Sequence, residues 1–142
     1  MFSKETEYAL RSLVYIQTEN FKGRRPGTLE IAREIDSPQF FTAKILQKLV
    51  RSGFIRSSKG RGGGFYFQSD KPGLSLRDVI IAVEGEHIIK GCGFGLKDCN
   101  EDNPCPLHER YGPVRQAIEE LVSTETIQSL AGKIFQKSGV RK

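Results

Sequence analysis

The sequence has no hydrophobic run that could cross a membrane and too few cysteines for a disulfide scaffold. No apolar segment approaches the ~20 residues that a membrane-spanning helix needs. Residues 1–5 carry neither an apolar signal core nor an arginine-rich amphipathic pattern, so we expect a cytoplasmic protein without membrane contact. The three cysteines are an odd number, which argues against a closed set of intrachain disulfides.

Acidic residues are missing from a long stretch in the first half of the chain. None occurs between Asp36 and Asp70, whereas residues 1–67 as a whole hold 12 Lys and Arg against 6 Asp and Glu, a balance of +6. Residues 68–142 hold 10 against 11, a balance of −1. A surface that needs only solubility intersperses both signs, so we favour contact with a polyanion over a merely solvated basic face.

Apolar periodicity, caps and glycines predict a helix-turn-helix followed by a β-hairpin. Three helices are expected: one over 3–18 capped by Ser3, one capped by Thr28 and running to 35, and one capped by Ser37 and running to about Ser52, with Pro38 at its first position. Strands over 54–58 and 65–68 flank a glycine-rich tip, which supplies the positive φ angles of a tight connection. This order of elements is that of a winged helix.

The second half is expected to be helical on both sides of a cysteine-rich loop. Ser75 caps one helix, apolar residues from Val114 to Val122 recur at helical spacing, and Thr124 caps a final helix. We therefore predict a mostly α-helical fold with a small β-hairpin wing. Its expected parts are a winged helix-turn-helix domain over 1–73 and a region over 74–142 that holds the cysteine loop, at about 90–108.

The start of the helix after Ser37 is the first candidate site. The N-terminal residues of such a helix reach base edges in the major groove of double-stranded DNA. For Phe40, a DNA contact and a place in the hydrophobic core are equally good interpretations. Phe41 is expected to be a core residue. The residues expected to contact DNA here are Ser37, Pro38, Gln39, Phe40, Thr42 and Lys44, with Lys48 and Arg51 continuing along the phosphates.

The hairpin tip adds Lys59, Arg61 and Gly62 to this site, with Arg61 placed to enter a minor groove. A glycine-rich loop that cradles a nucleotide phosphate is the weaker alternative. The tip joins two strands instead of opening a helix, and it lacks the Gly-x-x-x-x-Gly-Lys-Ser/Thr pattern.

Four soft metal ligands form the second candidate site: Cys92, Cys99, Cys105 and His108, which fall within 17 positions. Thiolate and imidazole bind zinc or iron–sulfur clusters, and the long intervals favour a cluster, since no Cys-x₂₋₄-Cys pair is present. A zinc site and a metal-free thiol switch stay open. An enzyme with a cysteine nucleophile is disfavoured, because only His108 is an evident base, and we expect no enzymatic activity.

Along nearly its whole length the chain resembles the IscR/NsrR-like family of bacterial winged-helix transcription regulators. The resemblance rests on residues 8–11 (YALR), 44–49 (KILQKL), 52–55 (SGFI), 59–65 (KGRGGGF), 76–80 (LRDVI) and the Cys92…Cys99…Cys105-Pro106-Leu107-His108 loop. It implies a homodimer that is built on a helix over about 113–123 and binds a roughly palindromic operator, and we expect this chain to act as a repressor.

The resemblance also implies that the three cysteines hold a 2Fe–2S or, less favoured, a 4Fe–4S cluster that senses redox, iron–sulfur or nitric oxide status. It favours His108 as the fourth ligand over Glu7 of the partner subunit. Six residues separate Cys92 from Cys99, where the best-known cluster-assembly regulators have five. Some relatives lack cluster ligands, so the alternative is a cluster-free or zinc-binding regulator that responds to thiol oxidation or to a partner protein.

Overall fold

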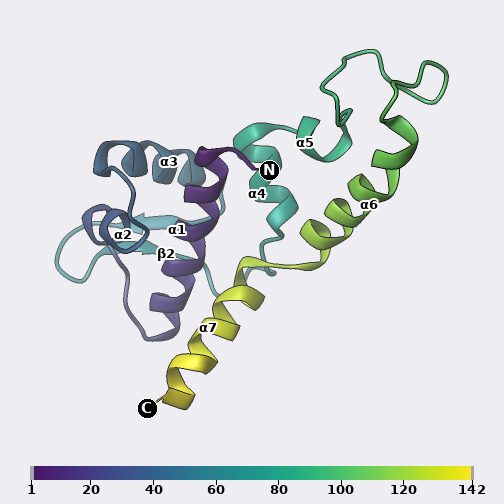
Figure 1. The fold of residues 1–142 in the computed structure, drawn as a ribbon. Helices are drawn as coiled ribbons and strands as arrows, with labels where there is room; N and C mark the ends of the chain where they lie inside the picture. Colours follow the sequence, from purple (N-terminus) through teal and green to yellow (C-terminus); the bar gives the residue numbers. More distant parts are fainter. Residues whose placement is uncertain (1, 142) are drawn as a thin grey trace.

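The computed structural model describes residues 2–141 and consists of a helical body with a projecting arm (Figure 1). It confirms the mostly α-helical fold with one two-stranded antiparallel hairpin. Within the described residues, no helix has the length and apolar character to span a membrane. The elements in chain order are α1 (Lys4–Phe21), α2 (Thr28–Glu34), α3 (Gln39–Arg51), β1 (Arg56–Ser58), β2 (Gly64–Tyr66), α4 (Leu76–Glu84), α5 (His87–Lys90), α6 (His108–Thr124) and α7 (Ile127–Arg141).

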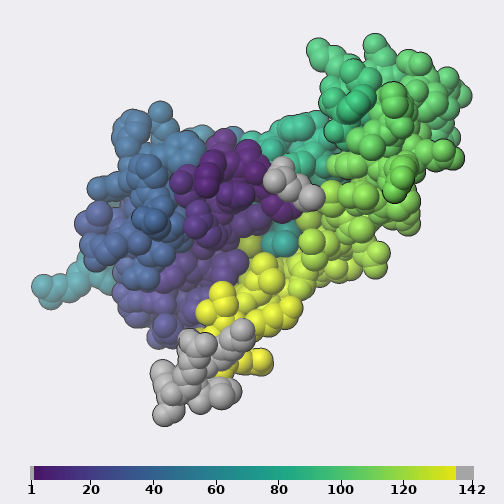
Figure 2. Space-filling view, in the orientation of Figure 1, coloured from purple at the N-terminus to yellow at the C-terminus, as the bar shows by residue number. Residues whose placement is uncertain are grey.

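Helix α1 is the central element of the body. Ser3 caps it as expected, because its hydroxyl accepts a 3.1 Å hydrogen bond from the Thr6 N–H. Its buried face carries Ala9, Leu13 and Ile16, and the helix contacts α2, α3, α4 and α7. Figure 2 shows α7 lying against the body at the end of the chain. The core therefore joins residues of both expected regions, and the division at residue 73 stays a prediction.

The helix-turn-helix forms from α2 and α3, with two local corrections to the expected caps. Thr28 is the first residue of α2 and follows an N-cap at Gly27. Pro38 is the N-cap of α3 instead of its first residue. The Ser37 hydroxyl makes no capping bond and contacts the Thr42 hydroxyl.

The hairpin, which we call the wing, comprises β1, β2 and their connection. Arg56 pairs with Tyr66 and Ser58 with Gly64, so the strands are shorter than expected. Gly60 has a φ of 85°, which a residue with a side chain rarely adopts. The wing is tied to the α1–α2 loop, because the Phe65 N–H donates to the Pro26 carbonyl at 2.9 Å.

The arm consists of α5, the cysteine loop and the first turns of α6. Ser75 caps α4 as expected, with its hydroxyl accepting from the Asp78 N–H at 3.1 Å. Helix α6 begins at His108, five residues before the expected start at 113. The cap before α7 is Thr126, whose hydroxyl accepts from the Ser129 N–H at 2.9 Å. Thr124 instead ends α6, and its hydroxyl donates to the Glu120 carbonyl.

Candidate DNA-binding surface and metal centre

Helix α3 presents a row of polar and aromatic side chains to solvent. Phe40, Lys44, Gln47 and Arg51 follow one another at helical spacing and are exposed. Phe40 is 75% exposed, which decides between its two interpretations in favour of a surface position. The Lys44 ammonium lies 4.7 Å from the centre of the Phe40 ring. The pair therefore presents a positive charge and an apolar ring together at the start of α3. Phe41 packs against Tyr8, with 5.6 Å between ring centres, as a core residue does.

Two residues expected to contact DNA are engaged by other parts of the protein. Thr42 is 0% exposed, and its hydroxyl donates to the Pro38 carbonyl at 2.9 Å. Lys48 is half-buried, with its ammonium 3.4 Å from the Glu5 carboxylate. In this structure Thr42 therefore stabilises the start of α3, and Lys48 joins α3 to α1.

Gln47 occupies the exposed row in place of Lys48, and sequence reasoning missed it. The signal was available, because Gln47 lies three residues after Lys44 and four before Arg51. The position of α1 and α4 on the other side of α3 is what excludes Lys48 from the row.

A cleft of about 360 Å³ separates α3 from the wing. It is lined by Gln47 and Arg51 of α3, by Ser57 and Phe65 of the wing, and by Thr28, Ala43 and Val50. None of these residues is acidic. Lys59 and Arg61 are exposed at the wing tip, next to Gly62 with its φ of 75°.

The base of the wing is braced by Arg25. Its guanidinium lies 3.8 Å from the centre of the Tyr66 ring and donates to the Ser58 hydroxyl at 3.1 Å. Asn20 adds a second brace, because its side-chain oxygen accepts from the Phe67 N–H at 2.8 Å. These contacts fix the wing relative to the body.

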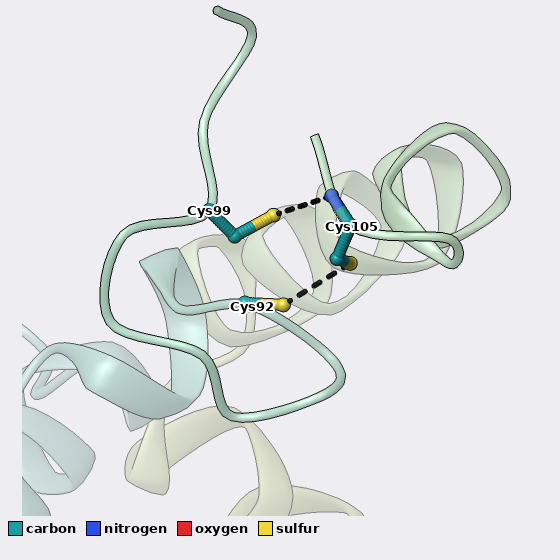
Figure 3. A group of neighbouring side chains, drawn as sticks. All are labelled: Cys92, Cys99 and Cys105. Atoms are coloured by element: carbon teal, nitrogen blue, oxygen red, sulfur yellow. Dashed lines mark hydrogen bonds between the residues drawn. The ribbon is translucent and has the colours of Figure 1, made fainter. Parts of the chain in front are cut away.

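The cysteine loop brings its three thiols together at the end of the arm (Figure 3). The Sγ atoms of Cys92 and Cys105 are 3.4 Å apart, and the Cys105 N–H donates to the Cys99 Sγ at 3.4 Å. All three sulfurs lie within 4.8 Å of one another, and each side chain is partly exposed. His108, the first residue of α6, has its Nδ1 atom 3.3 Å from the Cys99 Sγ.

The loop backbone favours the thiolate form of one cysteine. N–H groups of Leu96 and Phe94 hydrogen-bond to Cys92 and lower its pKa to about 7. The Cys105 N–H lowers the pKa of Cys99, but burial and the neighbouring thiols outweigh it, so that this pKa is raised. The thiolate is the form of cysteine that binds metals, so these hydrogen bonds favour metal binding by Cys92.

The donor set fits a metal centre. Three sulfurs and one imidazole nitrogen are the ligand types of zinc and of iron–sulfur clusters. Around one tetrahedral ion with bonds of ~2.3 Å, sulfurs lie about 3.8 Å apart, close to the spacing seen here. A cluster of several irons needs some of its ligands further apart, and the loop that carries the partly exposed thiols contains Gly91, Gly93 and Gly95.

Glu7 is not part of this group within one protomer. It lies on α1, and its carboxylate is 3.7 Å from the Lys4 ammonium. The cysteine loop projects away from α1, beyond α4 and α5 (Figure 1). Within one protomer the structure therefore brings His108, and not Glu7, next to one of the thiols.

The chain matches known proteins along most of its length. A family model described as Rrf2, iron-dependent transcriptional regulator, matches residues 2–133. Protein aau3 of Rhizobium meliloti is 32% identical over 130 residues, which cover 90% of this chain and 82% of that protein. The transcriptional repressor NsrR of Streptomyces coelicolor is 30% identical over 105 residues, or 74% of this chain and 66% of the relative.

Two solved structures share the fold. CymR, the global cysteine regulator of B. subtilis, superposes with a TM-score of 0.74 at 19% identity, covering 94% of this chain and 97% of CymR. IscR of T. potens superposes with a TM-score of 0.69 at 17% identity, covering 94% and 88%. These likenesses confirm the winged-helix architecture.

Proposed function

This chain belongs to the Rrf2 family of transcriptional regulators, and we propose that it binds operator DNA as a homodimer under the control of a metal centre. Family membership confirms the resemblance found in the sequence and, with it, the expectation of a regulator that is not an enzyme. One observation carries the proposal beyond the family level. Three thiols meet at the end of the arm, with His108 of α6 beside Cys99, on a body that exposes a basic recognition helix and wing.

The proposed DNA contacts follow the exposed surface. Gln39, Phe40 and Lys44 would enter the major groove at the start of α3, flanked by Ser37 and Pro38. Gln47 and Arg51 would follow the groove edge along the cleft beside the wing. Lys59, Arg61 and Gly62 would meet the adjacent minor groove, which the glycines allow the backbone to approach closely.

The proposed dimer would form on α6. This helix exposes Val114 and Leu121, which are 47% and 54% exposed, beside the face that packs on α4 through Ile118 and Val122. A second copy would cover these side chains and place two recognition helices about a twofold axis. The two helices would then read a roughly palindromic site, with repression as the expected outcome.

The metal would be held by Cys92, Cys99 and Cys105, with His108 as the fourth ligand and Glu7 of the partner subunit as the alternative. A 2Fe–2S cluster is favoured over 4Fe–4S and over zinc, and when bound it supplies one-electron redox chemistry. The Leu96 and Phe94 N–H groups hold the Cys92 thiolate. The Cys105 N–H orients Cys99, and His108 anchors the loop to α6.

The first experiment is an absorption spectrum with iron and sulfide assays on protein purified without oxygen. We expect brown protein with broad absorption around ~400 nm and iron and sulfide in cluster proportions. Cys99→Ala should be colourless yet folded, and Lys97→Ala, at an exposed position of the same loop, should stay brown. His108→Ala and Glu7→Gln, compared side by side, identify the fourth ligand.

Three results would contradict the metal proposal. Colourless wild-type protein with stoichiometric zinc would replace the cluster by a zinc site, and protein without metal after reconstitution would leave a thiol switch. If the Cys99→Ala variant unfolds, the loop is required for the stability of the fold and is not mainly a sensor. None of these results affects the DNA proposal, which selection from a random duplex pool tests separately. An inverted repeat bound by two protomers is expected, and a single half-site bound by a monomer would refute the dimer.

A further inference from the structure

One face of α6 holds the cysteine loop at three points. His108 approaches Cys99, and Arg115 donates from Nη1 to the Lys90 carbonyl at 3.3 Å. Tyr111 lies between them and packs on Gly93. The three residues are spaced by three and four positions, which places them on one side of a helix. The same stripe continues into Ile118, which is buried toward the body.

The contact between Tyr111 and Gly93 is close. A Cβ atom added to Gly93 would lie 2.7 Å from Cδ1 and 2.8 Å from Cγ of the Tyr111 ring. Gly93 directly follows Cys92, and the next residue, Phe94, donates its N–H to the Cys92 Sγ at 3.3 Å. The ring therefore rests on the backbone turn that orients Cys92.

The first turn of α6 is weakly attached to the rest of the helix. Pro113 lies inside α6 and has no N–H to donate to the Glu109 carbonyl, so one helical hydrogen bond is missing. Gly112 before it lowers helix stability by about 1 kcal/mol relative to alanine. The turn from His108 to Tyr111 consequently depends on its contacts with the loop for its position.

We propose that Tyr111 is the positioning residue that couples occupancy of the thiol site to α6. Metal bound at Cys92 orders the turn at Gly93, and this turn holds the Tyr111 ring and the first turn of α6 in place. Release of the metal frees the ring, and the turn before Pro113 shifts relative to the exposed face of Val114 and Leu121. The proposal rests on the metal centre proposed above and names the residue through which it acts.

The first test measures how fast reconstituted protein loses metal to a chelator. Tyr111→Ala should lose it about tenfold faster than wild type, as is typical when an outer partner of a metal site is removed. Tyr111→Phe, which keeps the ring, should restore the wild-type rate. Gln116→Ala, at an exposed position of the same helix, is the matched control and should not change it.

A double-mutant cycle separates coupling from a general loss of structure. Gly93→Ala should also speed metal loss, whereas Gly112→Ala should not, because a Cβ at Gly112 meets open space. Adding Gly93→Ala to Tyr111→Ala should have no further effect, since the clashing ring is already gone. The proposal would be overturned if the two substitutions increased the rate of metal loss independently of each other, or if Tyr111→Ala lost metal at the wild-type rate.

A spectroscopic test uses the absence of tryptophan from the sequence. Tyr111→Trp creates a single tryptophan at the contact, which can be excited separately from the remaining tyrosines, and Gln116→Trp places one on the outward side of the same helix. Anaerobic addition of Zn²⁺ should shift the emission of Tyr111→Trp and leave that of Gln116→Trp unchanged. If Zn²⁺ protects the thiols from Ellman's reagent but the emission of Tyr111→Trp stays constant, the coupling is refuted and the metal site is still supported. Wild-type thiols that neither iron nor Zn²⁺ protects would overturn both.

Discussion

Replacing Arg61 by alanine should weaken DNA binding and make it less sensitive to salt. Arg61 is exposed at the wing tip, and among residues 2–141 it forms no ion pair. Its charge is therefore available to the phosphates that line a minor groove. Each phosphate contact releases condensed counterions and adds about 0.9 to the slope of log K against log salt concentration.

The magnitude follows from the proposed dimer. Two Arg61 side chains are lost per dimer, so the slope should fall by about 1.8. The ratio of wild-type to variant affinity should then be about 12-fold larger at 50 mM salt than at 200 mM. A protein that binds as a monomer would show half that change in slope.

Fluorescence anisotropy on a labelled duplex of arbitrary sequence is sufficient, because phosphate contacts supply nearly all non-specific binding. Arg110→Ala is the control, since it removes the same charge from α6 at the far end of the molecule (Figure 1). Equal slopes for wild type and Arg61→Ala would refute the wing contact. An equal effect of Arg110→Ala would show that net charge, and not the wing, is responsible.

Three further predictions concern single side chains. Phe40→Ala should change the unfolding free energy by less than ~0.5 kcal/mol because the ring is exposed, yet weaken binding to a selected operator by about tenfold; unchanged operator affinity would exclude Phe40 from the interface. Thr42→Val should destabilise the protein by about 1 kcal/mol in urea unfolding, through loss of the bond to the Pro38 carbonyl, and an unchanged midpoint would contradict that role. The Arg24 guanidinium hydrogen-bonds Glu30 and holds the pKa of this carboxyl below its ordinary range, so the pair stabilises the fold at neutral pH and loses this effect as acid protonates Glu30. Arg24→Ala should consequently reduce stability at pH 7 more than at pH 3, and equal losses at both pH values would disprove the linkage.

Local features were predictable from the sequence because they depend on residues a few positions apart. Ser3 and Ser75 cap their helices as predicted, since each needs only an N–H three residues later. Gly60 and Gly62 adopt positive φ at the wing tip. The family was also recognisable, because its glycine and cysteine motifs are short and their order is preserved along the chain.

Boundaries and faces were less predictable. The start of α6 was placed near Pro113, but the helix begins at His108, because loop contacts hold a turn that the proline alone would disfavour. Lys48 follows Lys44 by four residues, a spacing that predicts the same helix face. Its ammonium group instead contacts the Glu5 carboxylate of α1 and the Val83 carbonyl of α4. The periodicity of apolar residues indicates that a helix has a buried and an exposed face. It does not say how many positions the buried face includes.

The amino-acid sequence by itself determined the order of elements, the basic recognition helix, the glycine-rich wing tip and the set of thiols available for a metal. Those properties depend on residue type and on short spacing. Only the tertiary structure decided that the three sulfurs meet within 4.8 Å, that Thr42 is buried while Phe40 is exposed, and that Tyr111 rests on Gly93. Each of these facts depends on how helices pack and loops close, and packing is set by the whole core and not by any one segment.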